Sequence, residues 1–268
     1  MNWLFANCQR LLPKHLISRL IGFAAATNTV WLKTILINTF CAFYKINWQE
    51  AARPDPMAYT SFNDFFSREL RPGCRPTTGR FSSPADGLVS ASGHLEAGQL
   101  IQAKGIYYKL DALVGDQISD QFCNGSYLTV YLAPHDYHRV HFPCNGQLRS
   151  SHCIPGDLYS VNAATTEHID GLFTRNERLV FRLSTAQGEL IMVMVGAMIV
   201  AAMQAVWNSS PYKAGCTIQE SFDQYMVEQG HEAGRFLLGS TVILITNWRT
   251  DWRVCSGDKL RVGENLEL

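Results

Sequence analysis

Short apolar runs separated by turn residues constrain the fold of this chain more than any other feature. Beyond about residue 80, such runs occupy residues 127–132, 179–183 and 190–195, with glycine, asparagine, aspartate and proline between them. Runs of this length and composition are typical of strands joined by turns. The pattern predicts a predominantly antiparallel β domain over residues 81–268. A chain of 268 residues is long enough to give such a domain a substantial core.

The first 49 residues differ from the rest in both charge and periodicity. All 23 acidic residues of the chain lie beyond them, whereas they carry five basic residues, which are Arg10, Lys14, Arg19, Lys33 and Lys45. Their apolar residues recur at the spacing of amphipathic helices. The predicted fold class is therefore α+β. Amphipathic helices in residues 1–47 precede a connecting region, residues 48–80, with one short helix near residues 62–68, and the β-rich domain follows.

The N-terminal segment has two interpretations. A basic, apolar segment joined to an acidic remainder favours an anionic membrane surface as partner, with the five basic residues facing the headgroups. The alternative is a helical cap packed on the β domain. No uncharged apolar run reaches the ~18 residues needed to cross a bilayer. Nucleic acid is disfavoured as a partner, because the basic residues alternate with apolar stretches.

Cysteine and histidine spacing gives no support for a metal site. The eight cysteines form no Cys-x-x-Cys pair, so neither a zinc ribbon nor a disulfide framework is predicted. His135, His138 and His141 recur at every third position, but no set of cysteines and carboxylates that could complete a zinc site lies nearby. We therefore expect no bound metal.

The tetrapeptide Leu238-Gly239-Ser240-Thr241 lies directly before another apolar run, residues 242–245. It does not match the Gly-x-Ser-x-Gly turn of serine hydrolases. A glycine and a serine before a strand are ordinary turn residues. The same arrangement also allows the Ser240 hydroxyl to attack the preceding carbonyl. β-Elimination from the resulting ester would cut the chain and leave a pyruvoyl group at position 240. These four residues alone leave both interpretations open.

Three short segments, taken together with their order along the chain, resemble the motifs of a known protein family. Residues 83–87 read Ser-Pro-Ala-Asp-Gly, residues 136–141 read Asp-Tyr-His-Arg-Val-His, and residues 238–241 form the tetrapeptide above. With residues 65–70, 155–162 and 234–236, these segments resemble the phosphatidylserine decarboxylase proenzymes of the bacterial, membrane-associated type. The resemblance extends over nearly the whole chain.

The resemblance implies a role for individual residues. It assigns Asp86, His141 and Ser240 to a self-cleavage triad, in which histidine takes the hydroxyl proton and the carboxylate orients the histidine. His138 would lie near the substrate, as an acid/base or positioning group in decarboxylation. Without the resemblance, a hairpin turn is the better explanation of Asp86 and the glycine after it.

The resemblance also implies the maturation and the reaction. Cleavage between Gly239 and Ser240 would give a β chain, residues 1–239, and an α chain, residues 240–268, held together without a covalent link. The pyruvoyl group derived from Ser240 would be the cofactor, forming an imine with the amine of phosphatidylserine and accepting the electrons left when CO₂ departs. The product would be phosphatidylethanolamine.

Two rival functions remain at this stage. A serine hydrolase acting on lipid at the membrane surface would keep Ser240 in an uncut chain. A noncatalytic membrane-binding β domain would use Asp86 as a turn residue and Ser240 as a loop residue. A decarboxylase would be expected as a peripheral protein on the cytoplasmic face of the cell membrane. The sequence leaves open a homodimer, the acyl-chain preference and the residues that hold the glycerophosphate.

Overall fold

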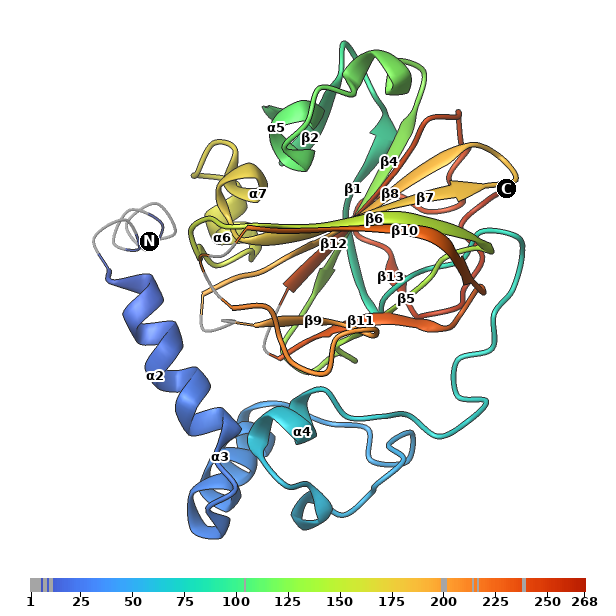
Figure 1. The fold of residues 1–268 in the computed structure, drawn as a ribbon. Helices are drawn as coiled ribbons and strands as arrows, with labels where there is room; N and C mark the ends of the chain where they lie inside the picture. The colour runs from blue at the N-terminus through green and yellow to red at the C-terminus, as the bar shows by residue number, and fades with distance from the viewer. Residues whose placement is uncertain are drawn as a thin grey trace.

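The computed structural model of the protein describes residues 6, 9, 12–103, 105–198, 202–213, 215, 217–237 and 240–268 (Figure 1). In these residues eight antiparallel strands form one large sheet. In spatial order they are β10 (Ile218–Val227), β6 (Gly146–Ile154), β7 (Arg178–Thr185), β8 (Glu189–Val195), β12 (Ser240–Thr246), β4 (Ser126–Leu132), β1 (Gly87–His94) and β13 (Lys259–Leu260).

Two smaller sheets accompany the large one in the described residues. One has the order β5 (Arg139–His141), β11 (Glu232–Phe236) and β9 (Met203–Ala205), and the other pairs β2 (Gln99–Ala103) with β3 (Ile106–Lys109). The three-stranded sheet lies between the large sheet and the N-terminal helices (Figure 1). Short helices in the connections are α5 (Leu110–Val114), η2 (Ser119–Phe122), α6 (Ala163–Thr166) and α7 (Leu172–Arg175).

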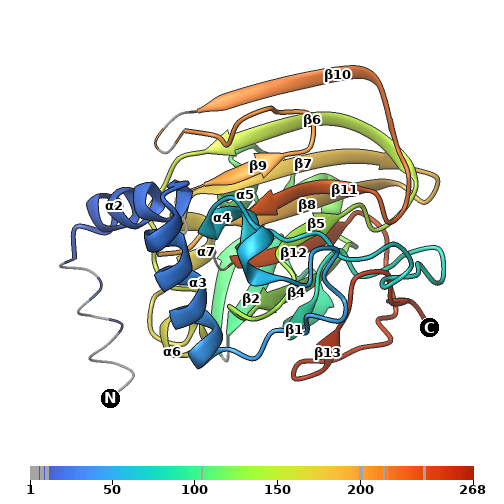
Figure 2. The same ribbon diagram turned by 90° about the horizontal axis from the view of Figure 1, so that it is seen from below.

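The N-terminal part is helical, as predicted. It contains α2 (Lys14–Ala26), α3 (Val30–Phe43), η1 (Pro56–Ala58) and α4 (Phe62–Phe66), which lie together on one side of the β domain (Figure 2). The α+β fold class and the short helix near residues 62–68 are therefore confirmed. Pro13 and Thr29 precede α2 and α3, although neither supplies a side-chain cap.

The central strand β12 is the most completely enclosed part of the sheet. It pairs with β4 on one side and β8 on the other, and all its residues are buried. The apolar residues 242–245 are fully buried, which confirms the predicted strand there. Backbone pairing on both sides and burial on both faces hold this strand independently of what precedes it in the chain.

The orientation of the N-terminal helices differs from the prediction. Lys14 and Lys33 point inward and are nearly inaccessible, at 6% and 9% exposure, whereas Leu20 and Phe23 of α2 are 64% and 82% exposed. Lys14 Nζ donates to the Gln9 carbonyl and lies 3.4 Å from Asp157 Oδ1. The expectation that both lysines face lipid headgroups is therefore wrong, because each long side chain reaches polar groups beneath its helix. Arg10 lies outside the described residues.

The inner faces of the helices form a small core of their own. Its buried members are Ala25, Ile37, Tyr59, Phe62, Phe65 and Phe66. The outer faces leave large apolar side chains in solvent, including Leu16, Leu20, Phe23, Val30, Trp31, Ile35 and Phe43. Among the described helices, none alone has the length and hydropathy of a membrane span, although α2 and α3, bent by 111°, meet those criteria together.

Candidate active site

Ser240 is the first residue of the central strand. It pairs with Leu132 at the end of β4, and its neighbour Thr241 pairs with Val195 of β8. The Ser240 side chain is fully buried, and its Oγ has no hydrogen-bond partner among the described residues. The predicted cleavage position also involves Gly239, which, with Leu238, lies outside the described residues.

Strand pairing brings the histidine segment beside the segment that leads to Ser240. After β4 ends at Leu132, the chain passes through residues 133–138 into β5, which pairs with β11. The Phe236 N–H donates to the His138 carbonyl over 3.0 Å. Two backbone pairings thus join segments that are far apart in the sequence. Leu132 pairs with Ser240, and His138 pairs with Phe236. On its other side β11 pairs closely with β9, where a Cβ at Gly234 would lie 2.6 Å from the Gln204 carbonyl oxygen.

His138 is completely buried and has one unused ring nitrogen. Its Nδ1 lies 2.9 Å from the Asp136 carbonyl oxygen, which can only accept, so Nδ1 carries the proton. Nε2 therefore presents a lone pair, and it has no partner in the described part of the chain. The ring packs on Phe66 with a centroid distance of 4.1 Å. Burial lowers the pKa of His138 to about 3, so the ring is neutral at physiological pH.

His141 is held at both ring nitrogens. Nδ1 donates to the Gly230 carbonyl over 2.7 Å, and Nε2 accepts from the Tyr137 hydroxyl over 3.1 Å. The backbone N–H of His141 donates to the Pro84 carbonyl, and this hydrogen bond fixes His141 to the loop that contains Asp86. Burial lowers the pKa of His141, so this ring is also favoured in its neutral form.

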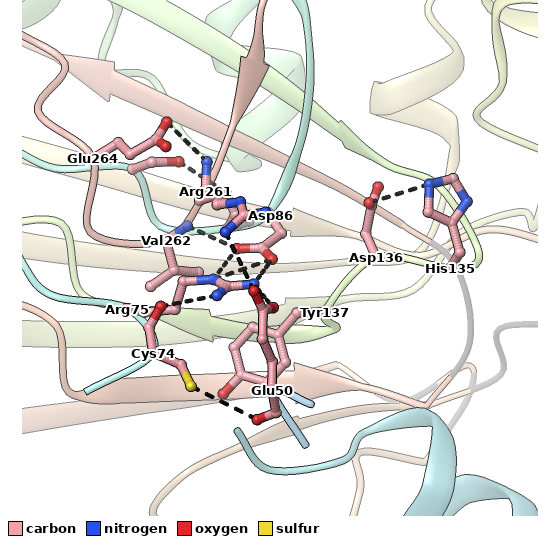
Figure 3. Close-up of polar contacts among 12 residues, drawn as sticks. Glu50, Cys74, Arg75, Asp86, His135, Asp136, Tyr137, Arg261, Val262 and Glu264 are labelled. Atoms are coloured by element: carbon pink, nitrogen blue, oxygen red, sulfur yellow. Dashed lines mark hydrogen bonds and ion pairs between the residues drawn. The ribbon is translucent and has the colours of Figure 1, made fainter. Parts of the chain in front are cut away.

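Asp86 accepts hydrogen bonds from two sides (Figure 3). Arg75 donates from Nε over 3.0 Å and from Nη2 over 2.6 Å, and the Val262 N–H donates over 2.8 Å. Arg75 Nη2 also donates to Glu50. Burial opposes the charge of Arg75, but these carboxylates outweigh it and raise the pKa of the guanidinium. Gly87 begins β1 rather than a hairpin turn, and a Cβ there would lie 2.4 Å from the Tyr131 carbonyl oxygen.

The structure therefore brings the predicted residues into two neighbouring pairs. Ser240 and His138 lie on the two joined segments, and a backbone hydrogen bond joins His141 of β5 to the loop that contains Asp86. No hydrogen bond connects the side chains of Asp86, His141 and Ser240, all of which are described. The assignment of these three residues to a triad stays a prediction. His135 has a 51% exposed side chain, and the described residues contain no cluster suited to a metal ion.

An apolar cavity of about 580 Å³ lies beside the segment that precedes the predicted cleavage position. Helix α2 contributes Leu16 and Phe23 to its wall, α4 contributes Asn63, and the β domain contributes Ala202 and Leu237. The exposed apolar face of α2 is thus continuous with a hollow that ends one residue before Leu238.

Comparisons with known proteins identify the family. The family model described as phosphatidylserine decarboxylase matches residues 62–267, and a second model, described as PSD, matches residues 4–45. A phosphatidylserine decarboxylase proenzyme of Saccharophagus degradans is 41% identical over 98% of this chain and 96% of its own length. Another from a Polaromonas species is 41% identical, over 96% of this chain and 95% of its own.

A proenzyme of the same description from Shewanella denitrificans is 45% identical, over 88% of this chain and 86% of its own length. The chain belongs to the phosphatidylserine decarboxylase family.

Proposed function

We propose that this chain is a proenzyme that cuts itself between Gly239 and Ser240 and then decarboxylates phosphatidylserine to phosphatidylethanolamine. The observation that carries the proposal is the placement of Ser240, whose buried hydroxyl lacks a partner at the first position of the central strand. Because β4 and β8 hold β12 on both sides, a cut before Ser240 leaves the strand in the sheet. The α chain then stays bound without a covalent link.

The cleavage is an acyl shift followed by elimination. Ser240 Oγ attacks the carbonyl carbon of Gly239 and gives its proton to a base, and the peptide C–N bond breaks to leave an ester. Loss of the Ser240 Cα proton then breaks the bond between Cβ and Oγ of Ser240 and releases Gly239 as a carboxylate. Hydrolysis of the remaining unsaturated amino end consumes water and releases ammonia, leaving a pyruvoyl group. By resemblance, His141 is the base and Asp86 orients it.

The residues around position 240 fit a pyruvoyl group. The group is no larger than the serine from which it forms, so the enclosed start of β12 can hold it. When present, the pyruvoyl carbonyl supplies an electron sink for the pair left by departing CO₂. His138 lies on the segment that follows β4, and its neutral Nε2, which has no partner among the described residues, is available to exchange a proton with a bound substrate. A buried, apolar surrounding disfavours the carboxylate charge that the reaction removes.

The proposal includes peripheral attachment to the cytoplasmic face of the cell membrane. The outward apolar residues of α2 and α3 support it, as does the apolar cavity beside Leu237, since together they give a lipid a route toward Ser240. Arg19 and Lys45 are exposed and free to meet anionic headgroups, each contributing on the order of 1 kcal/mol near such a surface. Apolar burial then makes the attachment only partly sensitive to salt.

The intact mass of the purified protein tests the maturation. Wild-type protein is expected as two chains, divided before residue 240, with the small chain blocked at its N-terminus. Ser240→Ala is expected as one uncut, inactive chain. Thr129→Val is the matched control, because it removes a buried hydroxyl from the neighbouring strand β4 and leaves the cleavage position unchanged. An uncut wild-type chain that decarboxylates phosphatidylserine would contradict the proposal, and one that hydrolyses lipid would favour the hydrolase.

Liposome co-sedimentation tests the attachment. Deleting residues 1–47 is expected to reduce binding to anionic liposomes and turnover of bilayer substrate while leaving self-cleavage possible. Because that deletion also removes part of the helical core, the variant Leu20→Gln/Phe23→Gln is the cleaner test. Met226→Gln is its control, since Met226 is 71% exposed on β10. Equal binding by all variants would assign the helices to a cap on the domain.

A further inference from the structure

Arg68 is a buried cation with unused donors. Its side chain is 4% exposed, and Nη2 donates to the carbonyls of His135 and Asp136 over 3.1 and 3.3 Å. Nε and Nη1 have no hydrogen-bond partner among the described residues, and no carboxylate there forms an ion pair with Arg68. A guanidinium stays charged in proteins, and burying it without an anion is strongly unfavourable. The arrangement indicates that Arg68 binds an anion.

The same guanidinium lines a cavity of about 420 Å³ with an excess of unpaired positive charge. Lys45 and Lys259 also line it, and neither forms an ion pair in the described part of the chain. Two of the acidic residues in its wall, Glu50 and Asp86, form ion pairs with a basic residue. Arg75 binds both Glu50 and Asp86.

Asp136 is the remaining acidic residue of the wall. Its Oδ2 accepts the Ala133 N–H, and its Oδ1 lies 3.5 Å from His135 Nε2. Its carboxylate is therefore engaged within its own loop and does not pair with Arg68. Three cationic side chains are left to face the cavity.

The segment that follows the apolar outer face of α3 contributes Lys45 to the wall of this cavity. Lys45 lies two residues after Phe43, the last residue of α3, which is 80% exposed. Tyr44 stacks on His135 with a centroid distance of 6.4 Å, which fixes the end of α3 against the loop that Arg68 holds. A group that enters the cavity while its apolar part stays at the surface of α3 would be amphipathic and anionic.

We propose that this cavity is a binding site for the phosphodiester of a glycerophospholipid headgroup, with Arg68 as its main donor and Lys45 and Lys259 beside it. The identity of the lipid rests on the proposed function. Guanidinium donors match phosphate oxygens in geometry and charge. The serine carboxylate of the substrate is a poorer occupant. Its charge is lost as CO₂, so a guanidinium partner would stabilise the ground state more than the transition state.

The phosphodiester can belong to the substrate itself or to a neighbouring anionic lipid. The two sources are distinguished in micelles of neutral detergent in which phosphatidylserine is the only phospholipid. If the bound phosphodiester belongs to the substrate, KM in these micelles depends on Arg68. Phosphate charge persists through the reaction, so kcat stays near the wild-type value. With the second source, KM in these micelles is unchanged. Stimulation by added phosphatidylglycerol then depends on Arg68.

The test compares Arg68→Gln, Arg68→Lys and the double variant Lys45→Gln/Lys259→Gln with wild-type enzyme. Arg68→Gln is expected to raise KM, or to weaken the phosphatidylglycerol response, by about 10-fold or more, the usual effect of losing a charge-assisted hydrogen bond. Arg68→Lys recovers part of the loss. Arg149→Gln is the control, because it removes one exposed positive charge on β6, outside the cavity wall. Self-cleavage on a gel reports folding of each variant.

If Arg68→Gln does not mature, the double variant decides, since Lys45 and Lys259 are exposed. Wild-type KM and an unchanged phosphatidylglycerol response in every matured cavity variant would overturn the inference. Wild-type protein without any CO₂ release would instead contradict the proposed function. In that case inorganic phosphate is the probe. It is expected to raise the Tm of wild-type protein and not that of the cavity variants, and equal shifts in both would overturn the site.

Discussion

The two pairs of predicted site residues differ in how their polar atoms are satisfied. Ser240 Oγ and His138 Nε2 are buried without partners, whereas the side chains of Asp86 and His141 are hydrogen-bonded on every side that the structure describes. A buried polar atom without a protein partner costs stability, and it remains available to a reacting group. The difference indicates that the Ser240–His138 pair is prepared for reaction. His141 can serve Ser240 only by exchanging its hydrogen bond with Tyr137.

The largest effect that tests this comparison is expected from His141→Ala. If His141 is the base, self-cleavage slows by about 10²- to 10⁴-fold, the usual contribution of a general base. A gel time course of the newly made protein measures the rate. His231→Ala is the control, because the side chain of this histidine is 67% exposed and its only ion pair among the described residues is the one with Glu228, three residues earlier. Normal maturation of His141→Ala would reverse the assignment and leave His138 as the base.

His138→Ala should separate maturation from turnover. At least part of the protein is expected to cleave, whereas CO₂ release per α chain falls by about 10²-fold, since the proposed proton-transfer group is lost. Quantifying the α chain by mass and CO₂ by release from labelled substrate gives both values. His231→Ala again serves as the control. Full activity of matured His138→Ala would show that its unpartnered Nε2 has no part in decarboxylation.

The β domain could be predicted from sequence because its strands are enclosed. Residues 127–132, 190–195 and 242–245 form continuous apolar runs, since β4, β8 and β12 are covered on both faces. The helices could be predicted as elements, but not their orientation. Helical periodicity shows that a face exists. It does not show whether Lys14 will reach a carbonyl and Asp157 beneath it.

Residues of the candidate site could be predicted from the sequence only where they belong to one of the family motifs. Asp86, His138, His141 and Ser240 were found through ordered motifs, which periodicity and composition do not reveal. Arg75 was missed, because it lies in an irregular segment whose charge pattern gives no sign of Asp86, 11 residues further on. Arg68 lay inside a recognised segment, but its unused donors follow from burial, which local sequence does not specify.

Arg75 tests whether the partners of Asp86 assist the site or restrain it. Arg75→Gln is expected to slow self-cleavage by about 10-fold, because the buried Asp86 carboxylate loses a bidentate, charged partner and with it a fixed orientation. Arg75→Lys should cleave itself at a rate between those of wild-type protein and Arg75→Gln. Faster cleavage in Arg75→Gln would show that Arg75 restrains Asp86.

The smallest expected effect is a pH dependence of stability that comes from His138. Its folded-state pKa of about 3 lies below the ordinary histidine value of about 6.5. Between these values the unfolded chain binds a proton that the folded chain does not. Stability therefore falls as the pH drops below 6.5, by about 2 kcal/mol from pH 7 to pH 5. Burial of His141 acts in the same direction.

Urea unfolding of the uncut Ser240→Ala protein at pH 7 and pH 5 measures this effect without the complication of two chains. Adding His138→Gln removes one titrating group, so the loss of stability between the two pH values should shrink by about 2 kcal/mol. The same substitution at exposed His231 serves as the control. If the pH dependence is unchanged in His138→Gln, the neutral, unpartnered state of His138 is wrong. The contrast between the two residue pairs would then rest on Ser240 alone.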